Sequence, residues 1–299
     1  MTKRVVKKKI DIKPGNESFI VGKIEKLKEK SLLLNGKFEV SIGNYAVLET
    51  AVKEKANLML IGDSGIGKTE LVYHYCKAKD IPLTILDMGT MTDPITSLIG
   101  SHIITVENGE QKSTFIRSRF SEIIQKPGIV LLDELSRASH TATNILFPCL
   151  DFRRELAMEY CFSDCKPIKI HPECIFFATV NIGAQYSGTN RLDRALIDRF
   201  MTIKVDNPVS LEFILENNFP NISKDIIDRV VAAKVAISKK YVDCQCSFDL
   251  NLRHIKNICQ LISGNLTPYD AFYNVCNGLS GEDGVNSITD ILTKLNEDK

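Results

Sequence analysis

The stretch LMLIGDSGIGKTELV, residues 58–72, decides the fold of this chain. It begins with apolar residues, as in a buried strand, and from residue 68 onward it can continue as a helix. Between these parts, Gly65 and Gly67 permit a tight loop whose backbone N–H groups point inward, and the helix offers its N-terminus to an anion. The stretch therefore predicts a cradle for the phosphates of a nucleotide.

The side chains of this loop have expected roles. Lys68 would reach the β- and γ-phosphates, and the Thr69 hydroxyl would be a ligand of Mg²⁺. A chance match in a glycine-rich turn is the alternative, which the strand before the loop and the helix after it disfavour. We expect the nucleotide to contact the loop and the start of the helix: Gly62, Asp63, Ser64, Gly65, Ile66, Gly67, Lys68, Thr69 and Glu70.

Polar residues also end two further apolar strands. GIVLLDELSRAS, residues 128–139, places Asp133 and Glu134 after a buried run. Asp133 would complete the Mg²⁺ site, and Glu134 would orient or deprotonate the attacking water. FFATVN ends in Asn181, whose side chain can hydrogen-bond the water or the γ-phosphate. Two adjacent carboxylates beside a phosphate loop indicate hydrolysis rather than binding alone.

Arginines follow in GTNRLDRALIDRF, residues 188–200, where Arg194 and Arg199 flank a short helix. Arginine suits the stabilisation of transition-state charge on a phosphoryl group, either from the same chain or from a neighbouring one. Salt bridges with Asp193 and Asp198 are the alternative explanation for both residues.

The apolar pattern changes twice along the chain. From Asn44, short apolar strands alternate with helices, which predicts a mostly parallel sheet covered on both faces. The expected strands are 57–61, 82–87, 128–133, 173–180 and 201–205, and the expected helices are 44–55, 68–78, 140–151 and 190–198. After Pro208 only helices are expected. The predicted domains are an N-terminal β extension (1–42), an α/β nucleotide-binding core (43–207) and a helical lid subdomain (208–299).

The N-terminal region looks separate from the core. KSLLLNGKFEVSI, residues 30–42, has Asn35-Gly36 between two apolar runs, which predicts a hairpin with a two-residue turn. The basic residues before it, between Lys3 and Lys9, could contact phosphates or form a solvated tail.

Composition excludes some classes of protein. The 299 residues carry a formal net charge of +1, so no overall field favours nucleic acid or a membrane surface. No run approaches the roughly 18 apolar residues of a membrane span, and we expect a cytoplasmic protein. Nine scattered cysteines suit reduced thiols. Cys161, Cys165, His171 and Cys174 could hold a metal, but ordinary loop and core positions are the favoured interpretation.

The order GDSGIGKT, VLLDE, ATVN and ALIDRF resembles the AAA+ ATPases. DELSRAS together with GTNRLDRALIDRF is similar to the MoxR-type branch, which includes the small cobaltochelatase subunit (CobS-like), the NorQ/CbbQ activators and the dynein-related group. The His171-Pro172 pair before the third motif resembles the chelatase subunit in particular. The similarity covers about residues 42–262 and implies a P-loop AAA+ core that uses ATP and Mg²⁺.

The resemblance also implies residue roles. Lys68 and Thr69 correspond to the Walker A lysine and magnesium ligand, and Asp133 and Glu134 to the Walker B pair. Asn181 corresponds to sensor 1. The arginine finger, which acts on the next subunit's nucleotide, corresponds to Arg199, and the sensor-2 residue in SFDLNLRHIKNI to Arg253. Two insertions, residues 101–119 and 153–171, are expected to be hairpins, the first directed at a ring pore.

Together these features predict a hexameric ring that hydrolyses ATP between subunits to remodel or activate a partner protein. Relatives often work with a partner that has a von Willebrand A-type domain and assist metal insertion. Lys112, Arg117 and Arg119 lie near one insertion, so a nucleic-acid motor that could use GTP stays the alternative. A non-hydrolysing switch and a metabolic kinase are less favoured.

Overall fold

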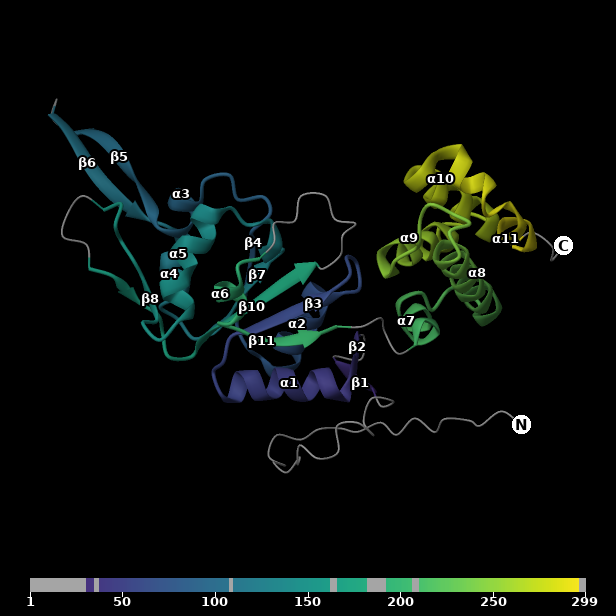
Figure 1. Cartoon of the computed structure of the whole chain (residues 1–299), viewed down its shortest axis with the longest axis horizontal. Coiled ribbons are helices and arrows are strands. Elements are labelled where there is room, and N and C mark those ends of the chain that lie inside the picture. The colour runs from purple at the N-terminus through teal and green to yellow at the C-terminus, as the bar shows by residue number, and fades with distance from the viewer. Residues whose placement is uncertain are drawn as a thin grey trace.

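The chain forms an α/β core and a C-terminal group of helices, and a long hairpin extends from the core on the side away from those helices (Figure 1). The basic N-terminal run lies outside the described part of the chain. The computed structural model describes residues 31–34, 38–107, 110–161, 166–181, 192–205 and 210–295.

A five-stranded parallel sheet lies at the centre of the core, as predicted, in the spatial order β11, β3, β10, β7, β4. The strands are β3 (Leu58–Gly62), β4 (Leu83–Asp87), β7 (Gly128–Asp133), β10 (Cys174–Asn181) and β11 (Met201–Lys204). Asn181 is opposite Gly62, and Asp87 is opposite Asp133. The residues that end these strands therefore meet at one edge of the sheet.

Helices cover both faces of the sheet, which explains the continuous apolar runs of the strands. Successive strand residues point to opposite faces. Leu58 packs in a buried cluster with α1 (Ile42–Lys53) and α2 (Lys68–Lys79), whereas Met59 packs in the cluster that contains α5 (His140–Leu150).

Three shorter helices complete the described core. They are α3 (Pro94–Leu98), α4 (Arg119–Ile123) and α6 (Arg194–Ile197). The helix expected over 190–198 is shorter than predicted, because Asp193 caps its first turn and accepts a hydrogen bond from the Ala195 N–H. Residues 182–191 lie outside the described part.

The N-terminal hairpin consists of β1 (Ser31–Leu34) and β2 (Phe38–Ser41), which are antiparallel. Leu34 pairs with Phe38, so three residues separate the paired ends, whereas the Asn35-Gly36 signal predicted two. The connecting residues 35–37 lie outside the described ranges.

This hairpin is not separate from the core in the described residues. Phe38 and Val40 are buried in the same cluster as β3 and α2, and the Phe38 ring stacks on His74 at 5.5 Å between centroids. A two-stranded hairpin needs another surface to cover its apolar face, and the core supplies it here. The domain boundary at residue 42 stays a prediction.

Both insertions are hairpins, as predicted. The longer one pairs β5 (Gly100–Glu107) with β6 (Glu110–Arg117), and the shorter pairs β8 (Glu155–Leu156) with β9 (Ile168–Lys169). Residues 108–109 at the expected turn of the longer hairpin lie outside the described part. Figure 1 shows β5 and β6 projecting from the body of the core.

The C-terminal helices share their own apolar core, which includes Leu215, Val230, Ile258 and Phe272. The helices are α7 (Leu211–Asn218), α8 (Lys224–Val242), α9 (Leu252–Ser263), α10 (Pro268–Asn286) and α11 (Thr289–Lys294). After residue 209 the described residues contain helices and no strand, as predicted.

No helix in the described ranges is long and apolar enough to cross a bilayer.

The prediction of reduced thiols holds for seven cysteines, which are free: Cys76, Cys149, Cys174, Cys244, Cys246, Cys259 and Cys276. It is wrong for Cys161, which is disulfide-bonded. Cys161 follows a turn rather than lying within an apolar helix or strand, and its partner lies outside the described residues. Cys165 is also outside them, so the metal-site alternative stays untested.

Candidate active site

The loop between β3 and α2 has the backbone that a phosphate cradle requires. Gly65 and Gly67 have φ values of 77° and 91°, in the left-handed region that glycine adopts without strain. A Cβ atom at Gly65 would lie 2.9 Å from the side chain of Asn251 in the C-terminal helices. Gly67 caps α2 and leaves the first N–H groups of that helix without a side-chain cap, free to meet an anion.

Lys68 is buried beneath this loop, with 7% of its surface exposed. Its Nζ donates to the carbonyls of Gly62 and Asp63, at 2.9 and 2.7 Å, and to Asn181 Oδ1 at 2.7 Å. Burial lowers the pKa of Lys68 to about 8, although the charge of Asp133 acts in the opposite direction. The negative charge of a bound phosphate group would favour the protonated form of Lys68.

Asp133 joins the loop to the neighbouring strands. Its Oδ1 accepts hydrogen bonds from Thr69 Oγ1 at 2.7 Å and from Thr179 Oγ1 at 2.5 Å. Thr69 lies in the first turn of α2 and Asp133 ends β7, so both reach the edge where the strands terminate. The predicted Mg²⁺ ligands are therefore in direct contact.

Glu134 follows Asp133 with φ 53° and ψ 42°, an uncommon left-handed conformation for a residue with a side chain. Its N–H donates to Thr179 Oγ1 at 2.9 Å. Its carboxylate pairs with Arg137 Nη1 at 2.9 Å. The sharp turn after β7 directs Glu134 toward the cavity beside the phosphate loop.

A cavity of about 210 Å³ brings most of the predicted site residues together, but not Arg194 or Arg199. Thr179 is a lining residue that the sequence analysis did not predict, and the helical lid lines the cavity with Leu252, Arg253 and Lys256. The expected residues that line it are Ser64, Gly65, Gly67, Lys68, Thr69, Glu70, Asp133, Glu134, Asn181 and Arg253.

Three other loop residues expected at the nucleotide do not line this cavity. Gly62 and Asp63 direct their carbonyls at Lys68 instead. Ile66 is buried in the core cluster of α1 and α2. Its side chain therefore anchors the loop to the core, since an apolar side chain gains more from burial than from a charged site.

Arg199 lies at the other end of the sheet. It precedes β11, whose first residue, Met201, pairs with Leu58 at the start of β3. The phosphate loop begins after Gly62, about 13 Å further along at roughly 3.3 Å per residue. Arg199 therefore lies away from the cavity of its own chain.

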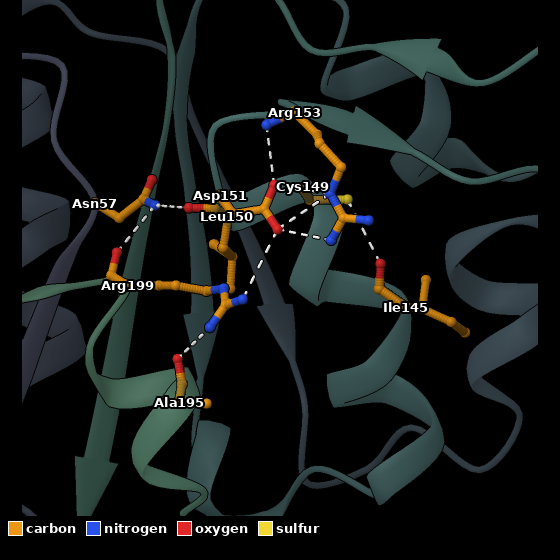
Figure 2. A network of polar contacts seen from close by, with 8 residues as sticks. All are labelled: Asn57, Ile145, Cys149, Leu150, Asp151, Arg153, Ala195 and Arg199. Carbon is orange, nitrogen blue, oxygen red and sulfur yellow. Dashed lines mark hydrogen bonds and ion pairs between the residues drawn. The ribbon is translucent and has the colours of Figure 1, made fainter.

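Contacts within the core hold the Arg199 side chain (Figure 2). Its Nη2 is 3.8 Å from Asp151 Oδ2, and Nη1 donates to the carbonyl of Ala195. The guanidinium also lies 4.6 Å from the centre of the Phe147 ring. Asp151 in turn accepts hydrogen bonds from Arg153, which keep the pKa of Asp151 below its usual value. The partner of Arg199 is thus Asp151, whereas Asp193 and Asp198 were the predicted alternatives.

The other two predicted arginines differ in position. Arg194 is exposed in the first turn of α6 and does not line the cavity. Arg253 lies in the first turn of α9 and lines the cavity, where a sensor-2 residue is expected.

Lys256 lines the cavity but was not predicted from the sequence. Its Nζ donates to both carboxylate oxygens of Glu70, at 3.0 and 2.9 Å, and thus connects the helical lid to α2. It stands one turn after Arg253, so it shares that residue's face of α9. The spacing from Arg253 was the only indication of Lys256 in the sequence. It does not identify the partner, Glu70, which lies 186 residues away along the chain.

The residues fit a magnesium nucleotide. The donor set combines a threonine hydroxyl with a carboxylate, and Mg²⁺ prefers such oxygen ligands supplemented by substrate phosphates. Gly65 and Gly67 line the cavity without side chains, which lets a phosphate approach their backbone. Lys68 would contact the phosphates, and Thr69 and Asp133 would hold the ion.

Comparison with known proteins identifies the domain. The family model of the AAA domain of the dynein-related subfamily matches residues 57–200, which include every motif from the phosphate loop to Arg199. Residues 57–200 of this chain therefore form an AAA domain of the dynein-related branch. Its five-stranded parallel sheet and C-terminal helices agree with the predicted P-loop AAA+ fold.

Several relatives resemble this chain over part of their length. "Putative chaperone BssE" of Thauera aromatica is 35% identical over 156 residues, 52% of this chain and 51% of the relative. Midasin of Giardia intestinalis is 25% identical over 231 residues, 75% of this chain but 5% of midasin. An uncharacterized protein of Staphylococcus epidermidis is 31% identical over 150 residues, 50% of this chain and 55% of that protein. The chain thus spans about half of two of these relatives and a small part of midasin.

Proposed function

We propose that this AAA+ protein hydrolyses ATP at the interfaces of a ring, with six subunits as the expected number, and uses the resulting motion to remodel or activate a partner protein. Lys68 would bind the phosphates, Asp133 and Thr69 would hold Mg²⁺, and Glu134 would accept a proton from the attacking water. The ion, when bound, neutralises charge on the phosphate oxygens. Asn181, which already contacts Lys68, would orient the water or the γ-phosphate.

One observation carries the proposal of a shared site: Lys68 and Arg199 lie at opposite ends of the sheet. An arginine about 13 Å or more from its own phosphate loop cannot complete that site without a large rearrangement. A neighbouring chain in head-to-tail contact could present the same arginine to this cavity. Arg199 is thus the candidate finger in trans.

The exposed surface of the longer hairpin favours a protein client over nucleic acid. Ile104 and Val106 on one face of β5 are 66% and 67% exposed, and Ile103 and Ile116 are exposed on the other face of the hairpin. Exposed apolar residues that are neighbours on one face, such as Ile104 and Val106, mark protein contacts more often than phosphate contacts. The basic residues Lys112, Arg117 and Arg119 are exposed beside them, so the nucleic-acid motor stays the second prediction.

Other parts of the proposal rest on family likeness. The name of BssE as a putative chaperone agrees with action on a protein. A partner with a von Willebrand A-type domain, a role in metal insertion and residence in the cytoplasm stay predictions.

Mixing two inactive variants tests the shared site. Lys68→Ala chains should not bind nucleotide, and Arg199→Ala chains should bind it but not hydrolyse it. Mixed together, they should regain hydrolysis at sites that combine an intact Lys68 with an intact Arg199. Glu134→Gln gives the blank rate. No recovery from a mixture that sizing shows to be co-assembled would contradict a finger in trans.

A further inference from the structure

Thr179 is a hydroxyl residue buried in the centre of the sheet. It lies on β10, between β3 and β7, with 2% of its surface exposed. The strand residues before it are apolar, and alternation along the strand places Thr179 on the same face as Asn181. A valine would fill this position equally well if packing were its only role.

Both hydrogen-bonding capacities of this hydroxyl are used, and both are used at the active site. Oγ1 donates to Asp133 Oδ1 at 2.5 Å and accepts from the Glu134 N–H at 2.9 Å. One hydroxyl group thus contacts both members of the Walker B pair. These contacts depend on the register of β10 with β7, in which Ala178 is opposite Leu132.

The contact with Glu134 stabilises an unfavourable backbone. Glu134 has φ 53°, and a residue with a side chain adopts this conformation only when its surroundings hold it there. Its N–H needs an acceptor in this partly buried position, and Thr179 Oγ1 is that acceptor. Loss of the hydroxyl would remove the acceptor and leave the turn free to relax.

The contact with Asp133 fixes a metal ligand. Asp133 Oδ1 accepts from Thr69 and from Thr179, so hydroxyls from α2 and from β10 together set the rotation of this carboxylate. Thr69 would become a ligand itself when Mg²⁺ binds, whereas Thr179 would stay as the support behind Asp133.

We propose that Thr179 is the positioning residue of the Walker B pair, which orients Asp133 toward Mg²⁺ and holds Glu134 in its left-handed turn. It acts through these two residues, to which both of its hydrogen bonds go. This role of Thr179 adds a residue to the proposed function. Only its effect on ATP hydrolysis rests on that function.

Two substitutions separate the hydroxyl from the shape of the side chain. Thr179→Val keeps the branched shape and removes the hydroxyl, and Thr179→Ser keeps the hydroxyl. Ser121→Ala is the matched control, because Ser121 is a fully buried serine on α4 whose hydroxyl bonds a backbone carbonyl away from the site. All three are compared by thermal unfolding to verify folding.

The first measurement needs no nucleotide. Amide hydrogen exchange of a peptide that spans residues 129–137 should accelerate by about tenfold at one amide, that of Glu134, in Thr179→Val, because one hydrogen bond is lost. Thr179→Ser and Ser121→Ala should exchange like the wild type. An unchanged Thr179→Val peptide would overturn the proposal.

The second measurement separates positioning from general damage. A fluorescent ATP analogue should bind Thr179→Val about tenfold more weakly than wild type with Mg²⁺, and within about twofold of wild type in EDTA. Thr179→Ser should restore the Mg²⁺-dependent part. Equal weakening in both conditions would mean a merely structural role and would overturn the assignment.

Hydrolysis then links the residue to function. The kcat of Thr179→Val should fall by about tenfold or more, with recovery in Thr179→Ser. A wild-type protein that binds but hydrolyses no ATP would refute the proposed function, while hydrogen exchange and Mg²⁺-dependent binding would still decide the role of Thr179.

Discussion

The buried ammonium group of Lys68 should make nucleotide binding take up a proton. In the free protein, burial lowers the pKa of Lys68 to about 8, so the group is largely neutral above that pH. Phosphates favour the charged form and should return the pKa to its usual value near 10.5 or higher. Binding between these two values therefore requires a proton from solution, and affinity should fall as the pH rises.

The size of the effect follows from the two pKa values. At pH 8.5 about a quarter of the free chains carry the proton, so binding should take up about 0.75 proton, whereas at pH 7 the uptake should be about 0.1. Affinity should weaken about tenfold between pH 7 and pH 9, since the free protein gives up most of its charge over that range.

Calorimetry in buffers of different ionisation enthalpy measures this uptake directly. ATP is titrated in EDTA, which prevents hydrolysis and removes any contribution from Mg²⁺. Lys68→Arg is the control, because arginine stays protonated throughout and its residual binding should take up no proton. Tight binding with an uptake below about 0.2 proton at pH 8.5 would refute the lowered pKa of Lys68.

Three further predictions concern the surroundings of the site. Asp151→Asn should lower the kcat of the assembled protein about two- to fivefold at unchanged nucleotide affinity, because it weakens the support of Arg199; an unchanged kcat would exclude this support. Lys256→Ala and Glu70→Ala, combined in a double-mutant cycle of unfolding free energies, should show a coupling of about 0.2–1 kcal/mol, and additive effects would show that the two side chains do not interact in solution. Gly65→Ala should weaken nucleotide binding about tenfold or more, because alanine is strained at a φ of 77°; normal affinity would mean that the loop adopts another conformation.

Local sequence patterns predicted the sheet and the centre of the site well. Each strand of a parallel sheet is a continuous apolar run, and each polar residue that ends such a run meets the others at one edge. Lys68, Asp133 and Asn181 could therefore be assigned to one cavity, which they do line.

Contacts between distant segments could not be predicted in the same way. The Thr179 hydroxyl reaches Asp133 and Glu134 only through the strand register, which no short motif encodes. The sequence offered Asp193 and Asp198 as alternative salt-bridge partners of Arg199, yet its partner is Asp151, which the fold brings beside it.

The N-terminal hairpin shows a related difficulty. Its turn signal identified two strands but did not show where their apolar side chains pack. The burial of Phe38 against α2 depends on the tertiary arrangement and connects the hairpin to the core.

The separation of Lys68 from Arg199 has a consequence for cells that contain both intact and defective copies. If every site uses Arg199 of the neighbouring chain, a chain that lacks both Lys68 and Arg199 inactivates its own site and the adjacent one. Activity then falls as the square of the intact fraction, so an equal mixture keeps about a quarter of the activity rather than half. Such a defective allele would be dominant over the normal one, and the strength of this dominance would report how many chains contribute to each site.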